Sequence, residues 1–291
     1  MNISVIAWDA CFREHFHTID SFLAQDYPKD KYEFIWVDFY TNKNPALLKK
    51  IEAHPNVSLL NLNHNPSENW HLGKCINAGV DEAKGDIIVL PDGDIVVQED
   101  HLQVIEDELK DRHEKILYFR RWDEPKNAHC ALSTNIDYLE KNTILTNPTN
   151  YAGCLCLNRS ALDKVSGYEE SEIFAGPGTN GKETYIRFRN AGFEIKWHSK
   201  KIYHPWHPST GSSDKYTSEL IEVAKYTKWL NPYCGIKQSW ALKSRGLDLS
   251  FVANDGTMNR YEDNAPALED LKKLQHKNTS MAKKILKTIF R

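Results

Sequence analysis

Short apolar runs alternate with amphipathic stretches along the first part of the chain, and this alternation predicts a regular order of strands and helices. Strands are expected at residues 2–8, 32–37, 57–62 and within 85–94, and helices with a 3.6-residue apolar period at 16–23, 45–53 and 72–83. The connections are short, which favours a right-handed, mostly parallel sheet with helices on both faces. The pattern predicts an α/β fold with the outline of a nucleotide-binding domain, although an outline alone does not define a function.

The second part of the chain contains the same kinds of element in a less regular order. We expect a helix capped by Asp100, strands at 116–119 and 152–157, helices at 160–165 and 183–190, and a last strand at 194–197. From about residue 213 the chain becomes polar, with weak helical periodicity. We therefore expect an α/β domain over residues 1–212 and a mostly helical C-terminal extension over residues 213–291.

The strongest chemical signal is the pair of acids in Asp92-Gly93-Asp94, which directly follows the apolar run Ile87 to Leu90. Open α/β sheets bind ligands outside the carboxyl ends of their strands, so two carboxylates at this position indicate a ligand that carries a divalent metal. The alternative is an ordinary hairpin, because Asp-Gly between apolar residues also favours a tight turn.

Composition and charge narrow the class of protein. The chain has 291 residues, of which 41% are hydrophobic and 26% charged, as is typical of a soluble globular protein. Its net charge of -3, with dispersed Lys and Arg, gives no reason to expect nucleic acid as a partner. The sequence contains no signal-peptide pattern and no apolar span of 18 residues, so we expect a cytoplasmic location. The six cysteines lack Cys-x-x-Cys pairs and are expected to be structural thiols.

Taken in order, several segments resemble the family 2 inverting glycosyltransferases with the GT-A fold. The matching segments are 3–6, 21–28, 34–38, 72–79, 83–88 and 92–94, and the resemblance spans roughly residues 3–207. It implies a GT-A fold for the α/β domain, with a mostly parallel sheet between helices. It also implies transfer of a sugar from a nucleotide sugar to an acceptor.

The resemblance gives the acids distinct roles. Asp92 would face the ribose and Asp94 would bind the metal, Mn²⁺ or Mg²⁺, because the departing diphosphate needs a Lewis acid to neutralise its charge. Asp38 ends the second predicted strand, where family members hydrogen-bond the base, and it suggests uracil and hence a UDP-sugar donor. The alternative for Asp38 is a solvated acid at a strand end.

Further donor contacts are implied around these acids. Ala7 and Trp8 stand where many members have a Pro-x-Tyr-Asn turn, and Trp8 would stack on the base. Gly73 would let the backbone approach the ligand, and Gly93 lies between the two acids. Lys74 would meet phosphate, with a solvated helix lysine as the alternative.

The sequence departs most from the family pattern at the position of the catalytic base. The Glu-Asp pair of many relatives falls on Asn180 and Gly181 here, and Glu183 follows at the start of a helix. An inverting transferase needs a carboxylate to take the proton of the acceptor hydroxyl, so Glu183 is the candidate base. The alternative is a first-turn acid that complements the helix dipole.

The segment His204-Pro-Trp-His207-Pro resembles the position from which related enzymes supply a histidine to the metal. Because the prolines hold the segment extended, we expect only one of the two histidines to face the metal, and we favour His204.

These residues predict a metal-dependent inverting enzyme that moves a sugar from a UDP-sugar to a glycan or lipid-linked acceptor in surface polysaccharide synthesis. One alternative is an Asp-dependent phosphohydrolase, although its acid pair usually follows the first strand and precedes Thr, whereas Ile95 stands here. The other is a degenerate transferase that binds nucleotide sugar without turnover. Residues 281–291 have apolar and basic sides, which predicts either peripheral contact with an anionic membrane or a helix docked on the protein.

Overall fold

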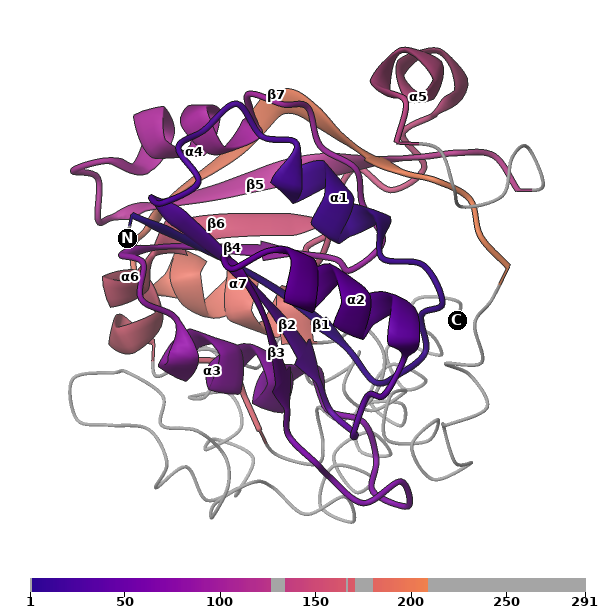
Figure 1. Cartoon of the computed structure of the whole chain (residues 1–291). Helices are drawn as coiled ribbons and strands as arrows, with labels where there is room; N and C mark the ends of the chain where they lie inside the picture. The colour runs from indigo at the N-terminus through magenta and orange to yellow at the C-terminus, as the bar shows by residue number, and fades with distance from the viewer. Residues whose placement is uncertain (1, 127–133, 166, 171–179, 209–291) are drawn as a thin grey trace, which may run out of the picture.

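The computed structural model describes residues 2–126, 134–165, 167–170 and 180–208, and in this part of the chain the strands form one sheet (Figure 1). The strands are β1 (Ile3–Asp9), β2 (Tyr32–Asp38), β3 (Val57–Asn61), β4 (Ile87–Pro91), β5 (Lys115–Asp123), β6 (Cys154–Asn158) and β7 (Glu194–His204). The helices are α1 (His17–Leu23), α2 (Pro45–Ala53), α3 (Leu72–Glu82), α4 (His101–Leu109), α5 (Ile136–Asn142), α6 (Arg159–Lys164) and α7 (Asn180–Asn190).

The order of strands in the sheet is β3-β2-β1-β4-β6-β5-β7. The pairs β2–β3, β1–β2, β1–β4 and β5–β7 are parallel, and β6 runs antiparallel to both β4 and β5. The expectation of a mostly parallel sheet is therefore confirmed. Because β6 is the reversed strand, β4 and β5 point the same way and end at the same edge as β1 and β2.

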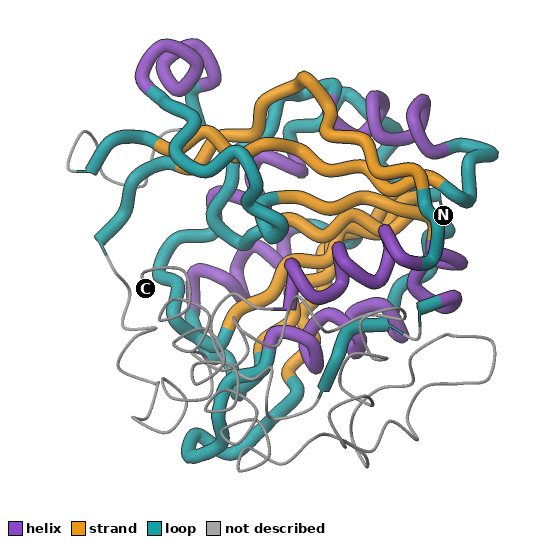
Figure 2. Tube along the Cα trace, turned by 180° about the vertical axis from the view of Figure 1, so that it is seen from behind, coloured by secondary structure: helices purple, strands orange, loops and turns teal. Residues whose placement is uncertain are grey.

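Helices cover both faces of the sheet, as predicted. Residues of α1, α2 and α4, among them Phe22, Leu47 and Ile105, form one core with the sheet. Residues of α3, α6 and α7, among them Ile76 and Leu162, form a second core on the opposite face. Figure 2 shows the arrangement of helices and strands from behind. This burial on both faces explains why β1, β2 and β4 have apolar residues at consecutive positions.

The predicted elements differ from the structure mainly in the second part of the chain. The last strand extends beyond Trp197 to His204, and β5 extends beyond Phe119 to Asp123 after a bulge. The extension of β7 contains polar residues that do not give a strand pattern in the sequence. Polar residues occur there because β7 lies at the edge of the sheet and most of its side chains are only partly buried. The short helix α5, which the sequence did not predict, packs Leu139 against the end of β7.

Several expectations fall outside the described residues. The proposed extension over residues 213–291 lies there, and so does the amphipathic segment 281–291. Within the described residues, no helix is both long and apolar enough to span a membrane. Of the four cysteines described, Cys75, Cys154 and Cys156 are buried thiols, in agreement with a structural role, whereas Cys11 is exposed.

Candidate metal and donor site

Charged residues gather where the parallel strands end. Asp9 and Asp38 are register partners at the ends of β1 and β2, and Asp123 and His204 are partners at the ends of β5 and β7. The backbone N–H of Asp92 donates to the carbonyl oxygen of Gly153 at 3.1 Å, which holds the turn after β4 against the start of β6. The topology thus brings acids from four strands to one edge of the sheet.

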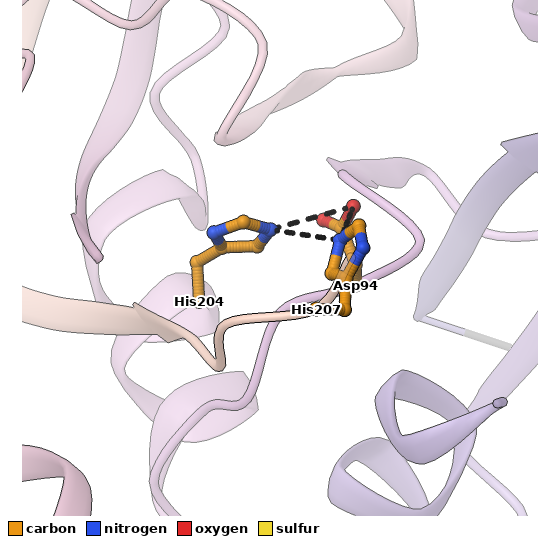
Figure 3. Close-up of side chains that lie close together, drawn as sticks. All are labelled: Asp94, His204 and His207. Carbon is orange, nitrogen blue, oxygen red and sulfur yellow. Dashed lines mark hydrogen bonds and ion pairs between the residues drawn. The ribbon is translucent and has the colours of Figure 1, made fainter. Parts of the chain in front are cut away.

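Asp94, His204 and His207 form a compact group at this edge (Figure 3). The Nε2 atoms of His204 and His207 lie 3.6 and 3.4 Å from Oδ2 of Asp94, and 3.3 Å from each other. Donor atoms bonded at about 2.1 Å to one ion lie roughly 3 to 3.5 Å apart. The spacing of these three atoms therefore suits a divalent cation.

The second nitrogen of each imidazole has a partner of its own. Nδ1 of His204 lies 3.1 Å from Oδ1 of Asp123, and Nδ1 of His207 lies 2.9 Å from the carbonyl oxygen of Pro208. A carbonyl oxygen only accepts hydrogen bonds, so Nδ1 of His207 carries a proton directed at Pro208. This is the arrangement that orients histidine ligands in metalloproteins.

Both histidines approach Asp94, whereas the sequence led us to expect that only one of them faces the metal. The backbone N–H of Trp206, between the two histidines, donates to a carboxylate oxygen of Glu124 at 2.8 Å and helps to hold this segment in place.

The electrostatics of the group favour an ionised Asp94. Burial opposes its ionisation, but Arg13 and His204 hold the pKa of Asp94 well below its usual range. Burial likewise lowers the pKa of His204, but Asp94 and Asp123 outweigh this effect and raise it to about 9. Oδ1 of Asp94 is buried and has no hydrogen-bond partner among the described residues. A pKa near 9 means that His204 is protonated at neutral pH when no metal is bound, so a cation such as Mn²⁺ would have to displace the proton on Nε2 in order to bind there.

Asp92 differs from Asp94 in its surroundings. Burial and the neighbouring charge of Asp94 raise the pKa of Asp92, although Arg121 opposes this rise. Arg121 lies 3.3 Å from Oδ2 of Asp92 through one terminal nitrogen and 2.9 Å from Oδ1 of Asp123 through Nε. The two acids of the triplet are thus held in different ionisation environments, as acids with different roles often are.

Asp38 is fully buried, so the alternative of a solvated strand-end acid is wrong. Its Oδ1 accepts from the backbone N–H of Cys11 at 2.8 Å, and its Oδ2 accepts from Trp36 Nε1 at 2.9 Å and Asn42 Nδ2 at 2.6 Å. Burial and the charge of Asp9 raise the pKa of Asp38 to about 6. Because Asp38 is fully buried, a base could reach this carboxyl only if a neighbouring protein group moved aside.

The remaining predicted donor contacts are mostly packed against protein. Ala7 and Trp8 are buried, and Trp8 lines a small apolar cavity with Tyr151. A Cβ at Gly73 would lie 2.1 Å from the carbonyl oxygen of Glu169, so close backbone packing requires this glycine. Lys74 lies half-buried in the first turn of α3.

Glu183 lies in the first turn of α7, fully buried, and is paired with Arg187 one turn later. Its two oxygens accept from Nε and a terminal nitrogen of Arg187 at 2.6 and 2.8 Å. Arg187 also donates to the carbonyl oxygens of Val165 and Gly167. These contacts support the structural role that was weighed against catalysis.

Sequence reasoning missed three charged residues of the site, namely Arg13, Arg121 and Asp123. Asp123 had a detectable signal, since Arg-Arg-Trp-Asp follows the apolar residues of a predicted strand and its acid ends that strand. Arg13 had none, because it lies in a loop and its partner Asp94 is 81 residues away.

Comparison with known proteins gave matches in family and fold. The family model described as Glycosyl transferase family 2 matches residues 17–166. A comparison with curated protein sequences gave no match. Among solved structures, residues 1–349 of TarS from S. aureus, in complex with UDP-GlcNAc, align with a TM-score of 0.52 and 19% identity, covering 78% of this chain and 65% of that one.

Two further solved structures align with this chain. GalNAc-T7 with UDP, GalNAc and Mn²⁺ aligns with a TM-score of 0.57 and 13% identity, covering 90% of this chain and 55% of that one. The mannosyltransferase PcManGT from Pyrobaculum calidifontis, with GDP-Man and Mn²⁺, has a TM-score of 0.49 and 15% identity, covering 97% of this chain and 80% of that one. The chain thus spans less than two thirds of the length of the TarS and GalNAc-T7 chains, and the likeness to them is one of fold.

Proposed function

Because the chain belongs to glycosyl transferase family 2 and is therefore a glycosyltransferase, we propose that it moves a sugar from a UDP-sugar to a glycan or lipid-linked acceptor with the aid of a divalent metal ion. The observation that carries this proposal is the convergence of Asp94, His204 and His207, with both Nε2 atoms directed at one carboxylate oxygen. The family match also makes the alternative of an Asp-dependent phosphohydrolase unnecessary.

In this proposal Asp94, His204 and His207 hold Mn²⁺ or Mg²⁺, and the two imidazoles favour Mn²⁺ because Mg²⁺ prefers oxygen ligands. The ion supplies positive charge to the departing diphosphate. Asp123 keeps His204 in the tautomer that has its lone pair on Nε2. Asp92, beside Arg121, is the candidate for the ribose contact.

A UDP-sugar is proposed as the donor because Asp38 stands at the position where family members hydrogen-bond the base. The TarS and GalNAc-T7 structures that share the fold contain UDP-GlcNAc and UDP, respectively. Discrimination of uracil by Asp38 would require its carboxyl to exchange a protein donor, such as Asn42 Nδ2, for the base. Asp38→Asn would then weaken UDP binding more than pyrophosphate binding; equal losses would argue against base recognition.

Inversion requires a base for the acceptor hydroxyl. Glu183 would serve only if it left Arg187, and the bidentate pair opposes this. Glu169 and Glu170, in the segment before α7, are the next described candidates. The pairing of Glu183 also keeps open the degenerate transferase that binds a donor without turnover.

One experiment separates these functions. Thermal stability is measured with a panel of UDP-sugars, with and without Mn²⁺, because a ligand that binds the folded state raises its melting temperature. Release of UDP is then measured with the best donor, with and without acceptor. Stabilisation without UDP release indicates the degenerate protein, and absence of Mn²⁺-dependent stabilisation by every UDP-sugar refutes the proposal.

A lipid-linked acceptor agrees with the proposed peripheral membrane contact of residues 281–291. Binding of the intact chain to anionic vesicles at low salt, and its loss on deletion of this segment, are expected. If the intact chain does not bind these vesicles, the membrane contact is refuted.

A further inference from the structure

Arg13 extends from the loop between β1 and α1 into the cluster of acids. Asp9 shapes this loop, because its Oδ2 accepts the backbone N–H groups of Phe12 and Arg13, each at 3.0 Å. Oδ1 of the same carboxylate accepts from a terminal nitrogen of Arg13 at 2.8 Å. Since the Asp9 side chain is fully buried, it anchors one end of the guanidinium.

The other end of the guanidinium contacts Asp94. The second terminal nitrogen of Arg13 donates to Oδ2 of Asp94 at 2.8 Å. This is the oxygen that Nε2 of His204 and Nε2 of His207 approach. Arg13 and a divalent ion held by the three residues would therefore compete for the charge of one carboxylate, although its Oδ1 has no hydrogen-bond partner among the described residues.

Gly93 leaves the space that this arrangement needs. A Cβ on residue 93 would lie 3.2 Å from both Cζ and Nε of Arg13, a distance tighter than nearly all real Cβ contacts. The middle residue of the Asp-Gly-Asp triplet thus admits the guanidinium between the strand ends. This role differs from the donor contact expected from the sequence.

Arg13 also retains capacity to bind an anion. Its Nε is buried and has no hydrogen-bond partner among the described residues, and its side chain is 20% exposed. A guanidinium carries five N–H donors, of which Asp9 and Asp94 engage two here. Planar donors of this kind bind phosphate oxygens well.

We propose, on the basis of the function proposed above, that Arg13 is a displaceable counter-ion. It holds Asp94 while no divalent ion is bound, and it binds the diphosphate of the donor once the ion takes Oδ2 of Asp94. Asp9 remains its anchor in both states. Arg13 is therefore expected to oppose binding of the metal alone and to strengthen binding of the nucleotide.

The test compares the wild type with Arg13→Gln and Arg13→Lys, and uses Arg112→Gln, an exposed arginine after α4, as the matched control. Mn²⁺ affinity without nucleotide is measured by electron paramagnetic resonance, and UDP affinity at saturating Mn²⁺ by calorimetry. For Arg13→Gln we expect Mn²⁺ to bind roughly tenfold more tightly and UDP roughly tenfold more weakly, as for loss of a charge-assisted hydrogen bond. Arg13→Lys keeps the charge and should change both less, and the control should match the wild type.

Opposite changes in the two affinities cannot come from general damage to the fold, which would weaken both. If Mn²⁺ binds the wild type but Arg13→Gln leaves Mn²⁺ affinity unchanged or weaker, Arg13 is not a competing counter-ion, and the proposed function stands. If the wild type binds no Mn²⁺ at all, the metal-dependent function fails and this inference fails with it.

Discussion

Replacing Glu183 by Gln separates a catalytic from a structural role. The carboxylate and Arg187 are 0% and 1% exposed in their side chains, so the pair is shielded from solvent. Removing one partner of a buried ion pair costs about 3–5 kcal/mol, because the other charge stays buried without compensation. For a domain of this size each kcal/mol lowers the melting temperature by roughly 2–4 °C. We therefore expect Glu183→Gln to melt roughly 6–20 °C below the wild type.

The assay has a control and an internal check. Glu52→Gln removes an exposed acid from α2 and should leave the melting temperature unchanged. Arg187→Gln should destabilise the protein as well, and the double variant should cost less than the sum of the two single variants, because each breaks the same pair. UDP binding is measured below the melting transition of each variant.

A catalytic Glu183 predicts a different result. Loss of a general base lowers turnover by about 10²–10⁴-fold while the fold and the donor affinity are kept. If Glu183→Gln melts like the wild type, binds UDP normally and loses turnover by this amount, the structural interpretation is refuted. Turnover retained in the less stable variant would direct attention to Glu169 and Glu170.

Three further changes test the site and its surroundings. Asp94→Ala should abolish Mn²⁺-dependent UDP-sugar binding in a thermal-shift assay without unfolding the protein, and retained Mn²⁺ dependence would exclude Asp94 as a ligand. Asp123→Asn should weaken Mn²⁺ binding about 10–100-fold by releasing His204, and unchanged affinity in a direct Mn²⁺ titration would show that Asp123 does not orient it. Burial lowers the pKa of His101 from 6.5 to about 3 in the folded protein. Between these pH values the unfolded chain binds a proton that the folded protein does not, so the free energy of unfolding is highest above pH 6.5 and falls by up to about 1.4 kcal/mol per pH unit as the pH decreases. His101→Phe should flatten this loss in urea unfolding between pH 7 and 5, and an unchanged pH dependence would contradict the assignment.

The fold was largely predictable because its signals are local. The first strands are mostly apolar and lie between helices of clear period, and the rule that ligands bind at carboxyl ends pointed to Asp94. The end of β7 was not predictable in this way, since an edge strand with polar side chains lacks alternation. His204 was nevertheless selected, because the family resemblance gave a position that the strand pattern did not.

The partners of the charged residues were harder to predict than the residues themselves. The pair of Glu183 and Arg187 has a spacing of four residues on one helix, so the sequence did contain its signal. The contact of Arg13 with Asp94 joins a loop to a strand end across the fold, and no periodicity encodes it. Asp38 was expected to be either solvated or bound to a base, because the donors that surround it belong to separate segments.

These partners decide how the site responds to its ligands. Arg13 neutralises Asp9 and Asp94, and Arg121 lies between Asp92 and Asp123, so the chain compensates the four acids with its own cations. A divalent ion that takes Asp94 would therefore release a positive charge of the protein, and the donor diphosphate would provide a new partner for it. If Arg13 acts in this way, metal and nucleotide each strengthen the binding of the other by the same factor, because coupling between two sites is reciprocal. The factor would be smaller in Arg13→Gln, since that variant keeps only the direct attraction between the ion and the diphosphate.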